Sequence, residues 1–226
     1  MFRPTVDYSG FSLKKLNDPR FSHFLLLGGW LVYFVLYFLT ENLITAEKCH
    51  PVHCFVDDLI PFNEFFVIFY VGWYVLCVIA LVRTAFTDVK NFRRLQTFIM
   101  ITQAVAMFFY IVWPTRQDLR PEVFPRDNFL TSVMAFIYAF DTPTGVSPSL
   151  HVAYSMGIMS VGLKDETLPR WAKCLLVFVV VMICLAVCFV KQHSFVDVLT
   201  ALLVSLFAEW LVFGKDYWKP RLAKRG

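Results

Sequence analysis

Six long apolar runs constrain this chain more than any other feature of its sequence. A helix that crosses a bilayer needs about 20 mostly apolar residues, and runs near that length fill more than half of the chain, separated by short polar stretches. We therefore predict an all-α integral membrane protein, a bundle of six transmembrane helices that forms one domain over residues 1–226. The predicted spans are Phe21–Leu43, Phe62–Ala85, Leu95–Trp113, His151–Leu163 extended toward Pro148, Trp171–Val190 and Phe195–Phe213.

The composition agrees with a membrane protein. Hydrophobic residues make up 58% of the chain and charged residues only 17%, whereas a soluble domain usually has about a quarter of its residues charged. The net charge of +4 is small and its basic residues are dispersed, so we expect the bilayer as a partner and no nucleic acid. The first apolar run is longer than the core of a signal peptide, about 7–15 residues, and we expect it to remain as a mature helix.

The positions of lysine and arginine predict the orientation, because basic residues concentrate in cytoplasmic loops. With six spans and both termini in the cytoplasm, sixteen of the 21 basic residues fall on the inner side. This asymmetry predicts a multi-pass protein of the cytoplasmic (plasma) membrane. The basic residues that remain outside are Lys48, Arg116, Arg120, Arg126 and Lys191.

Three of the predicted outer loops carry residues suited to chemistry. The loop after the third span contains two arginines, the loop into the fourth contains a serine and a histidine, and the loop into the sixth contains a lysine, a histidine and an aspartate. Because all three loops lie at one membrane surface, we predict an active site there. Its candidate residues are Arg116, Arg120, Ser149, His151, Lys191, His193 and Asp197.

Two histidines and an aspartate are the predicted catalytic residues. His193 and Asp197 are four residues apart, so a helix places both on one face. The carboxylate can then accept the N–H of one ring nitrogen and leave the other nitrogen as a nucleophile. His151 is available to protonate a leaving alkoxide.

The other four candidates are predicted to bind phosphate. Arg116, Arg120 and Lys191 can neutralise phosphate oxygens, and the arginines can do so with two parallel hydrogen bonds. Ser149 and the backbone before it can add donors at the start of a helix. Together the seven residues can transfer a phosphoryl group without a metal, and we expect no cofactor.

Three short motifs resemble the signatures of the type-2 phosphatidic acid phosphatase family, which are K-x6-R-P, P-S-G-H and S-R-x5-H-x3-D. The first is present only as R-P within residues 114–121, the second reads P-S-L-H at 148–151, and the third keeps H-x3-D within 191–197. The resemblance covers the six-span architecture and the placement of all three signatures. The motifs are specific in combination, although each alone would carry little weight.

The chain also departs from these signatures. Trp113 and Pro114 stand where the first signature has its lysine, and Val187 stands where the third has its arginine. With P-S-L-H in place of P-S-G-H, these changes resemble a subgroup that includes inositol phosphorylceramide synthase and sphingomyelin synthase-like lipid phosphotransferases.

The resemblance implies a membrane lipid-phosphate phosphatase that hydrolyses a phosphomonoester such as phosphatidic acid. His193 would form a phosphohistidine intermediate with Asp197 orienting it, and His151 would act as acid and then as base. Two alternatives stay open at this stage. One is a lipid phosphotransferase that passes a phosphoryl headgroup to an alcohol, and the other is a transporter or scaffold that has a decayed site.

Two further segments are of interest. The sequence C-H-P-V-H-C between Cys49 and Cys54 has thiols and imidazoles, but its spacing matches no structural zinc pattern. We therefore expect no metal there and leave a Cys49–Cys54 disulfide open. Asn63 and Glu64, at the outer end of the second span, are expected to cap that helix, with contact to a lipid headgroup as the alternative.

Overall fold

The chain folds into a bundle of long helices with short elements at one end. The computed structural model describes residue 4 and residues 6–222. The two strands are only two residues long each, so the predicted all-α class is confirmed. The helices of the bundle are α1 (Gly28–Leu43), α3 (Val67–Thr87), α4 (Val89–Val112), α6 (Leu150–Lys164), α7 (Arg170–Phe189) and α8 (Phe195–Leu222).

Among the described residues, five helical segments are long and apolar enough to cross a membrane, and they indicate a multi-pass membrane protein. Two of them include a 3-10 turn that leads into the α-helix, Ser22–Leu27 before α1 and Glu64–Phe66 before α3. Five of the six predicted apolar runs are therefore confirmed as helices of spanning length. The segments are Ser22–Leu43, Glu64–Thr87, Val89–Val112, Arg170–Phe189 and Phe195–Asp216.

The fourth predicted span forms α6, which has only 15 residues. At 1.5 Å per residue this helix is about 22 Å long, shorter than a hydrocarbon core of about 30 Å. It packs against α3, α4, α7 and α8, and most of its side chains are buried. A Cβ atom on Gly157 would lie only 2.6 Å from Cδ1 of Phe98, so a glycine is needed for α4 to approach α6 this closely.

Two helices extend beyond the predicted apolar runs. Helix α4 begins at Val89, ahead of the predicted Leu95, because Asp88 Oδ1 accepts a hydrogen bond from the Asn91 backbone N–H at 3.0 Å and caps the helix. Helix α8 continues to Leu222, past the predicted Phe213. An apolar run reports the part of a helix that can lie in lipid, whereas the cap decides where the helix begins.

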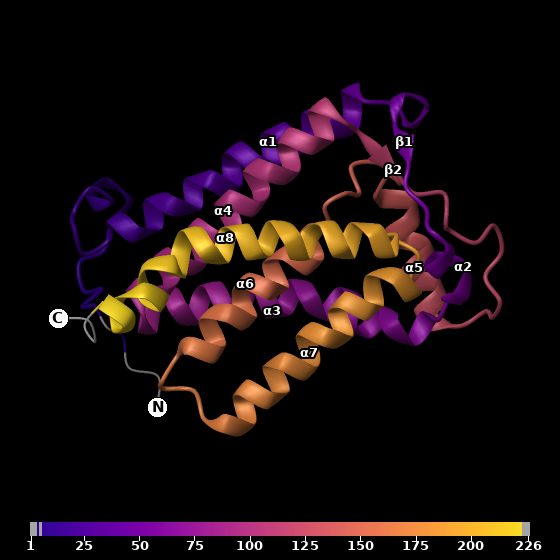
Figure 1. Cartoon of the computed structure of the whole chain (residues 1–226). Helices are drawn as coiled ribbons and strands as arrows, with labels where there is room; N and C mark the ends of the chain where they lie inside the picture. Colours follow the sequence, from indigo (N-terminus) through magenta and orange to yellow (C-terminus); the bar gives the residue numbers. More distant parts are fainter. Residues whose placement is uncertain (1–3, 5, 223–226) are drawn as a thin grey trace.

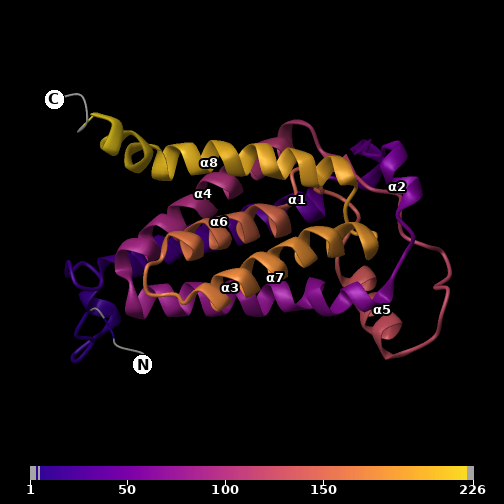
Figure 2. The same ribbon diagram turned by 60° about the horizontal axis from the view of Figure 1, so that its bottom comes forward.

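The short elements gather at one end of the bundle. They are β1 (His50–Pro51), which pairs in parallel with β2 (Thr115–Arg116), and the helices α2 (Phe55–Leu59) and α5 (Phe129–Phe140). The first described residues and the C-terminal part of α8 lie at the opposite end (Figures 1 and 2). Helix α5 was not predicted, because its 12 residues are too few for a span.

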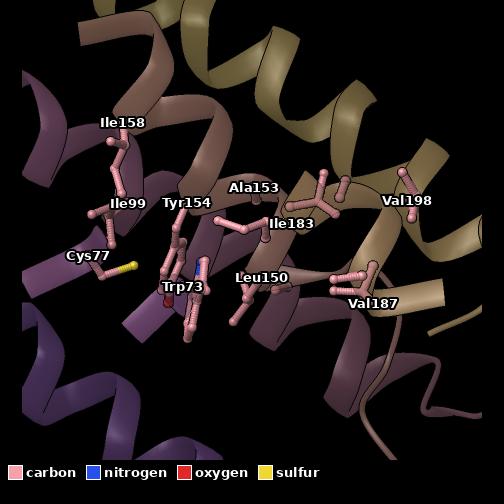
Figure 3. Packing of buried hydrophobic residues seen from close by; sticks show 14 of the residues in the cluster. Trp73, Cys77, Ile99, Leu150, Ala153, Tyr154, Ile158, Ile183, Val187 and Val198 are labelled. Atoms are coloured by element: carbon pink, nitrogen blue, oxygen red, sulfur yellow. The ribbon is translucent and has the colours of Figure 1, made fainter. Parts of the chain in front are cut away.

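A buried apolar cluster holds α3, α4, α6, α7 and α8 together. In Figure 3, Trp73 and Tyr154 lie side by side, and Leu150 at the start of α6 lies between Trp73 and the α7 residue Val187. Leu150, Val187 and Val198 belong to this cluster. The beginnings of α6 and α8 are thus fixed to rigid elements, and the candidate site is built on them.

Candidate active site

The beginnings of α6 and α8 bring four of the predicted residues together. Ser149 is the N-cap residue of α6 and His151 lies in its first turn. His193 lies just before α8, and Asp197 lies in the first turn of α8. The backbone N–H of Ser149 donates to the carbonyl of Asp197 at 3.2 Å, and the ring centroids of His151 and His193 are 5.6 Å apart.

The His193 and Asp197 side chains face each other, although His193 lies before the start of α8 and not on the helix, and no hydrogen bond joins the two side chains in the described chain. The His193 Nδ1 atom lies 3.5 Å from Asp197 Oδ2. The same oxygen accepts the backbone N–H of Ser194 at 2.9 Å, and the Asp197 side chain is fully buried. Within the described chain no hydrogen bond holds His193 Nε2, so this nitrogen is available to a ligand.

Aromatic rings hold His151 in place. Its ring stacks on Tyr70 with 4.6 Å between centroids and lies 4.2 Å from the ring of Trp73. Both aromatic residues come from α3, so three helices position the two histidines. His151 Nε2 is buried and has no hydrogen-bond partner among the described residues.

Unpartnered polar atoms distinguish this site. A buried donor or acceptor without a partner costs about 1–3 kcal/mol, and such atoms are few in folded proteins. Half of the buried side-chain atoms that lack a partner in the described chain meet here: Arg120 Nε, Ser149 Oγ, His151 Nε2, His193 Nδ1 and Asp197 Oδ1. The first three are open to a ligand, whereas the last two belong to the facing side chains of His193 and Asp197.

Arg120 reaches the site from the loop after β2. Its Nη1 donates to the carbonyls of Tyr138 and Asp141 at 3.1 and 2.9 Å. Its Nη2 donates to Gln192 Oε1 at 2.6 Å, next to His193 in the chain. The Nε–H is left for a ligand. Burial lowers the pKa of Arg120, and the guanidinium still stays charged near pH 7.

Gln192 and Asp141 complete a polar network that the sequence did not reveal. Gln192 Nε2 donates to Asp141 Oδ2 at 3.5 Å, and the Tyr37 hydroxyl donates to Asp141 Oδ1 at 3.1 Å. Burial raises the pKa of Asp141, and this outweighs the effects of the Tyr37 hydrogen bond and the Arg120 charge. The position of Gln192 beside His193 was a signal for it, but nothing marked Asp141 at the end of a short apolar helix.

The other two predicted phosphate ligands are engaged elsewhere. The Arg116 side chain donates to Asp118 at 3.1 Å and to the Ala46 carbonyl at 2.7 Å. Lys191 has a φ of 54°, and its Nζ donates to the Asp57 carbonyl at 2.9 Å. Among the three cations in the described chain, Arg120 alone combines a contact beside His193 with an unpartnered donor, so the structure does not bring the three predicted cations together at one point.

The Cys49–Cys54 segment forms neither a metal site nor a disulfide in the structure. Both thiols are free, and the described residues contain no metal-binding group of histidine, cysteine and acidic side chains. His50 stacks on Trp113 at 4.1 Å, and His53 pairs with Asp58 at 2.8 Å.

The beginning of the second predicted span has a structural role. The Asn63 side chain accepts the backbone N–H of Phe65 at 3.1 Å, which confirms the predicted cap. Glu64 accepts two hydrogen bonds from Arg126, at 2.5 and 2.7 Å, and one from Asn128 at 3.1 Å. The ion pair of Arg126 with Glu64 thus links the loop before α5 to the 3-10 turn that precedes α3.

These residues supply the groups that phosphoryl transfer needs: a nucleophile, a carboxylate that orients it, a second imidazole and anion donors. No known protein family, curated protein or solved structure matches this chain. The resemblance to the phosphatidic acid phosphatase signatures therefore depends on the motifs and on the way the fold brings two of them together.

Proposed function

We propose that the protein hydrolyses a phosphomonoester of a membrane lipid, such as phosphatidic acid, through a phosphohistidine intermediate and without a metal ion. The site would face outward from the cytoplasmic membrane, with both termini in the cytoplasm. One observation carries the proposal: the buried, unpartnered Ser149 Oγ and His151 Nε2 lie beside the facing His193 and Asp197 side chains, where α6 and α8 begin.

In this mechanism His193 Nε2 attacks the phosphorus atom while Asp197 accepts the N–H of Nδ1. As the P–O bond breaks, His151 protonates the departing lipid alkoxide oxygen to give the free hydroxyl, and it then removes a proton from the water that hydrolyses the phosphohistidine. The Nε–H of Arg120 and the hydroxyl of Ser149 donate to the phosphoryl oxygens. The lipid tails would enter sideways between helices from the bilayer.

The weak cationic clamp favours a second candidate, a lipid phosphotransferase. A phosphomonoester carries up to two negative charges at neutral pH, whereas a phosphodiester carries one. A site in which Arg120 is the cation beside His193 suits the singly charged group better. In this candidate an alcohol replaces water in the second step and takes the phosphoryl headgroup from His193.

A single experiment separates these functions. The purified protein is incubated with radiolabelled phosphatidic acid or a labelled phosphodiester lipid, with and without candidate alcohols. Free phosphate supports hydrolysis, and a new phosphodiester supports transfer. In both cases label should stay on the protein after rapid denaturation, and it should be lost in His193→Ala but kept in the control His53→Ala, an exposed histidine. If neither lipid reacts and vanadate does not bind, the non-catalytic alternative is favoured.

A further inference from the structure

A short loop helix, α2, contacts the segment that carries the proposed nucleophile. Helix α2 belongs to the connection between α1 and α3, far in sequence from His193. Its residue Asp57 is only 3% exposed. A buried carboxylate in a loop needs several hydrogen bonds to offset the loss of water, and Asp57 obtains them chiefly from the residues around His193.

Asp57 bonds to this segment on both sides of the histidine. Its Oδ2 accepts the hydroxyl of Ser194 at 2.6 Å, and its Oδ1 accepts the backbone N–H of Phe195 at 2.7 Å. On the other side of His193, the Lys191 ammonium donates to the Asp57 backbone carbonyl at 2.9 Å. Asp57 thus makes three hydrogen bonds with the turn that carries the His193 imidazole.

Ser194 links these contacts to the proposed catalytic pair. Its hydroxyl donates to Asp57, and its backbone N–H donates to Asp197 Oδ2. The same Asp197 oxygen faces His193 Nδ1. Both carboxylates therefore hold the Ser194 residue that directly follows His193.

We propose that Asp57 is a positioning residue, which fixes the turn of residues 191–195 so that His193 keeps its alignment with Asp197. The inference rests on the function proposed above, because it assigns Asp57 a role through His193 and no contact with substrate.

The charge of Asp57 fits this role. Burial by itself would raise the pKa of Asp57, but hydrogen bonds from Ser194, Phe195 and Cys54 together hold it below its usual range. Asp57 is thus ionised at neutral pH, and a negative charge at the beginning of α8 is favourable because it faces the positive end of the helix dipole.

The test uses two neighbouring aspartates. Asp57→Asn leaves one oxygen and an amide where two oxygens accepted hydrogen bonds, so the turn loses part of its support. Asp58→Asn is the matched control, because Asp58 is 67% exposed and pairs with His53. Turnover, KM and inhibition by vanadate are measured for both variants and the wild type in detergent. Vanadate mimics the transition state and reports how well His193 is aligned.

For Asp57→Asn we expect kcat to fall by about 10- to 100-fold, since small misplacements of reacting groups have effects of this size, while KM stays within about twofold. Half-inhibition by vanadate should require a higher concentration by a similar factor. Ser194→Ala should reproduce part of both effects, and Asp58→Asn neither.

Two results would overturn the inference in different ways. If Asp57→Asn lowers kcat but leaves vanadate inhibition unchanged, the substitution has only reduced the fraction of folded protein, and Asp57 is structural. If the wild type neither turns over a lipid phosphate nor binds vanadate, the proposed function fails and the positioning role fails with it.

Discussion

The two ends of the bundle differ in how completely their polar side chains are paired. At the end that contains the termini of the described chain, charges are matched: Arg83 pairs with Asp165 at 2.7 Å, Lys164 with Glu209 at 2.6 Å, and Arg94 with Asp216. His23, whose Nδ1 lacks a partner among the described residues, is an exception. At the other end Arg126 and Glu64 are also matched, but Arg120 Nε, Ser149 Oγ and His151 Nε2 lack partners in the described chain. Matched charges stabilise a fold, whereas unmatched buried groups are kept where a ligand completes them.

Replacement of Asp197 should have the largest effect of the four changes that test this contrast. Asp197→Asn preserves shape but removes the negative charge that orients the His193 imidazole in the proposed mechanism, and we expect kcat to fall about 10²- to 10⁴-fold. Asp118→Asn, an exposed aspartate of the same end, should change kcat less than twofold. Turnover of labelled phosphatidic acid measures both. Equal effects of the two substitutions would show that the unpartnered cluster is no active site.

A comparison of two arginines sharpens the assignment of the phosphate ligand. Arg120→Lys keeps the charge but loses the unpartnered Nε–H and the fork that bonds to Gln192, so kcat/KM should fall about 10- to 100-fold. Arg116→Lys should change it about twofold or less, because this side chain is engaged with Asp118 and Ala46. The measurement is kcat/KM of both variants and the wild type, from steady-state kinetics on the lipid substrate. A larger loss for Arg116→Lys would restore the clamp expected from the sequence.

At the opposite end, substitution should affect stability and leave the chemistry unchanged. Asp165 is 3% exposed and accepts hydrogen bonds from Thr167 as well as the ion pair with Arg83. Asp165→Asn should therefore cost about 1–3 kcal/mol of stability, read as a lower thermal midpoint in detergent. The kcat and KM of the folded fraction should equal those of the wild type. A change in KM would mean that the two ends are coupled.

The smallest expected effect is a pH dependence of stability at that same end. Burial by itself would raise the pKa of Asp165, but hydrogen bonds from Thr167 and Arg83 and the Arg83 charge hold it below its usual value. A depressed carboxyl pKa stabilises the fold above about pH 3.9, the unfolded value, and this contribution disappears as the pH falls through the folded pKa. Thermal midpoints between pH 7 and pH 3 should fall less steeply in Arg83→Met than in the wild type. If the thermal midpoints of the two proteins fall equally over this pH range, the ion pair of Arg83 with Asp165 does not contribute to the pH dependence.

The sequence allowed the helices to be predicted well because apolar runs report a physical requirement of the bilayer. Their ends were predicted less well, since a local cap such as Asp88 at α4 decides where a helix starts. Helix α5 was not predicted, because a 12-residue apolar stretch does not by itself indicate one type of structure. The 15-residue α6 was interpreted as a span because burial among protein and burial in lipid both select apolar residues.

The same distinction applies to the site residues: contacts between residues close in sequence could be predicted, and contacts between distant residues could not. His193 and Asp197 are only four residues apart at the beginning of α8, and this closeness is local information that the sequence contains. The directions of Arg116 and Lys191 depend on partners far along the chain, Ala46 and Asp57. Charge and loop position could not reveal these contacts, and for the same reason Asp57 and Asp141 were missed.

The close approach of α6 to α4 at Gly157 has a consequence for where the site stands. Since α6 is enclosed by α3, α4, α7 and α8, protein contacts set its height and its length need not match the hydrocarbon thickness. In a thinner or thicker bilayer the lipid-facing helices would tilt. His151 would keep its position, because α6 is held by its contacts with the other helices. The depth of the candidate site in the membrane is thus set by the fold itself and does not follow the thickness of the bilayer.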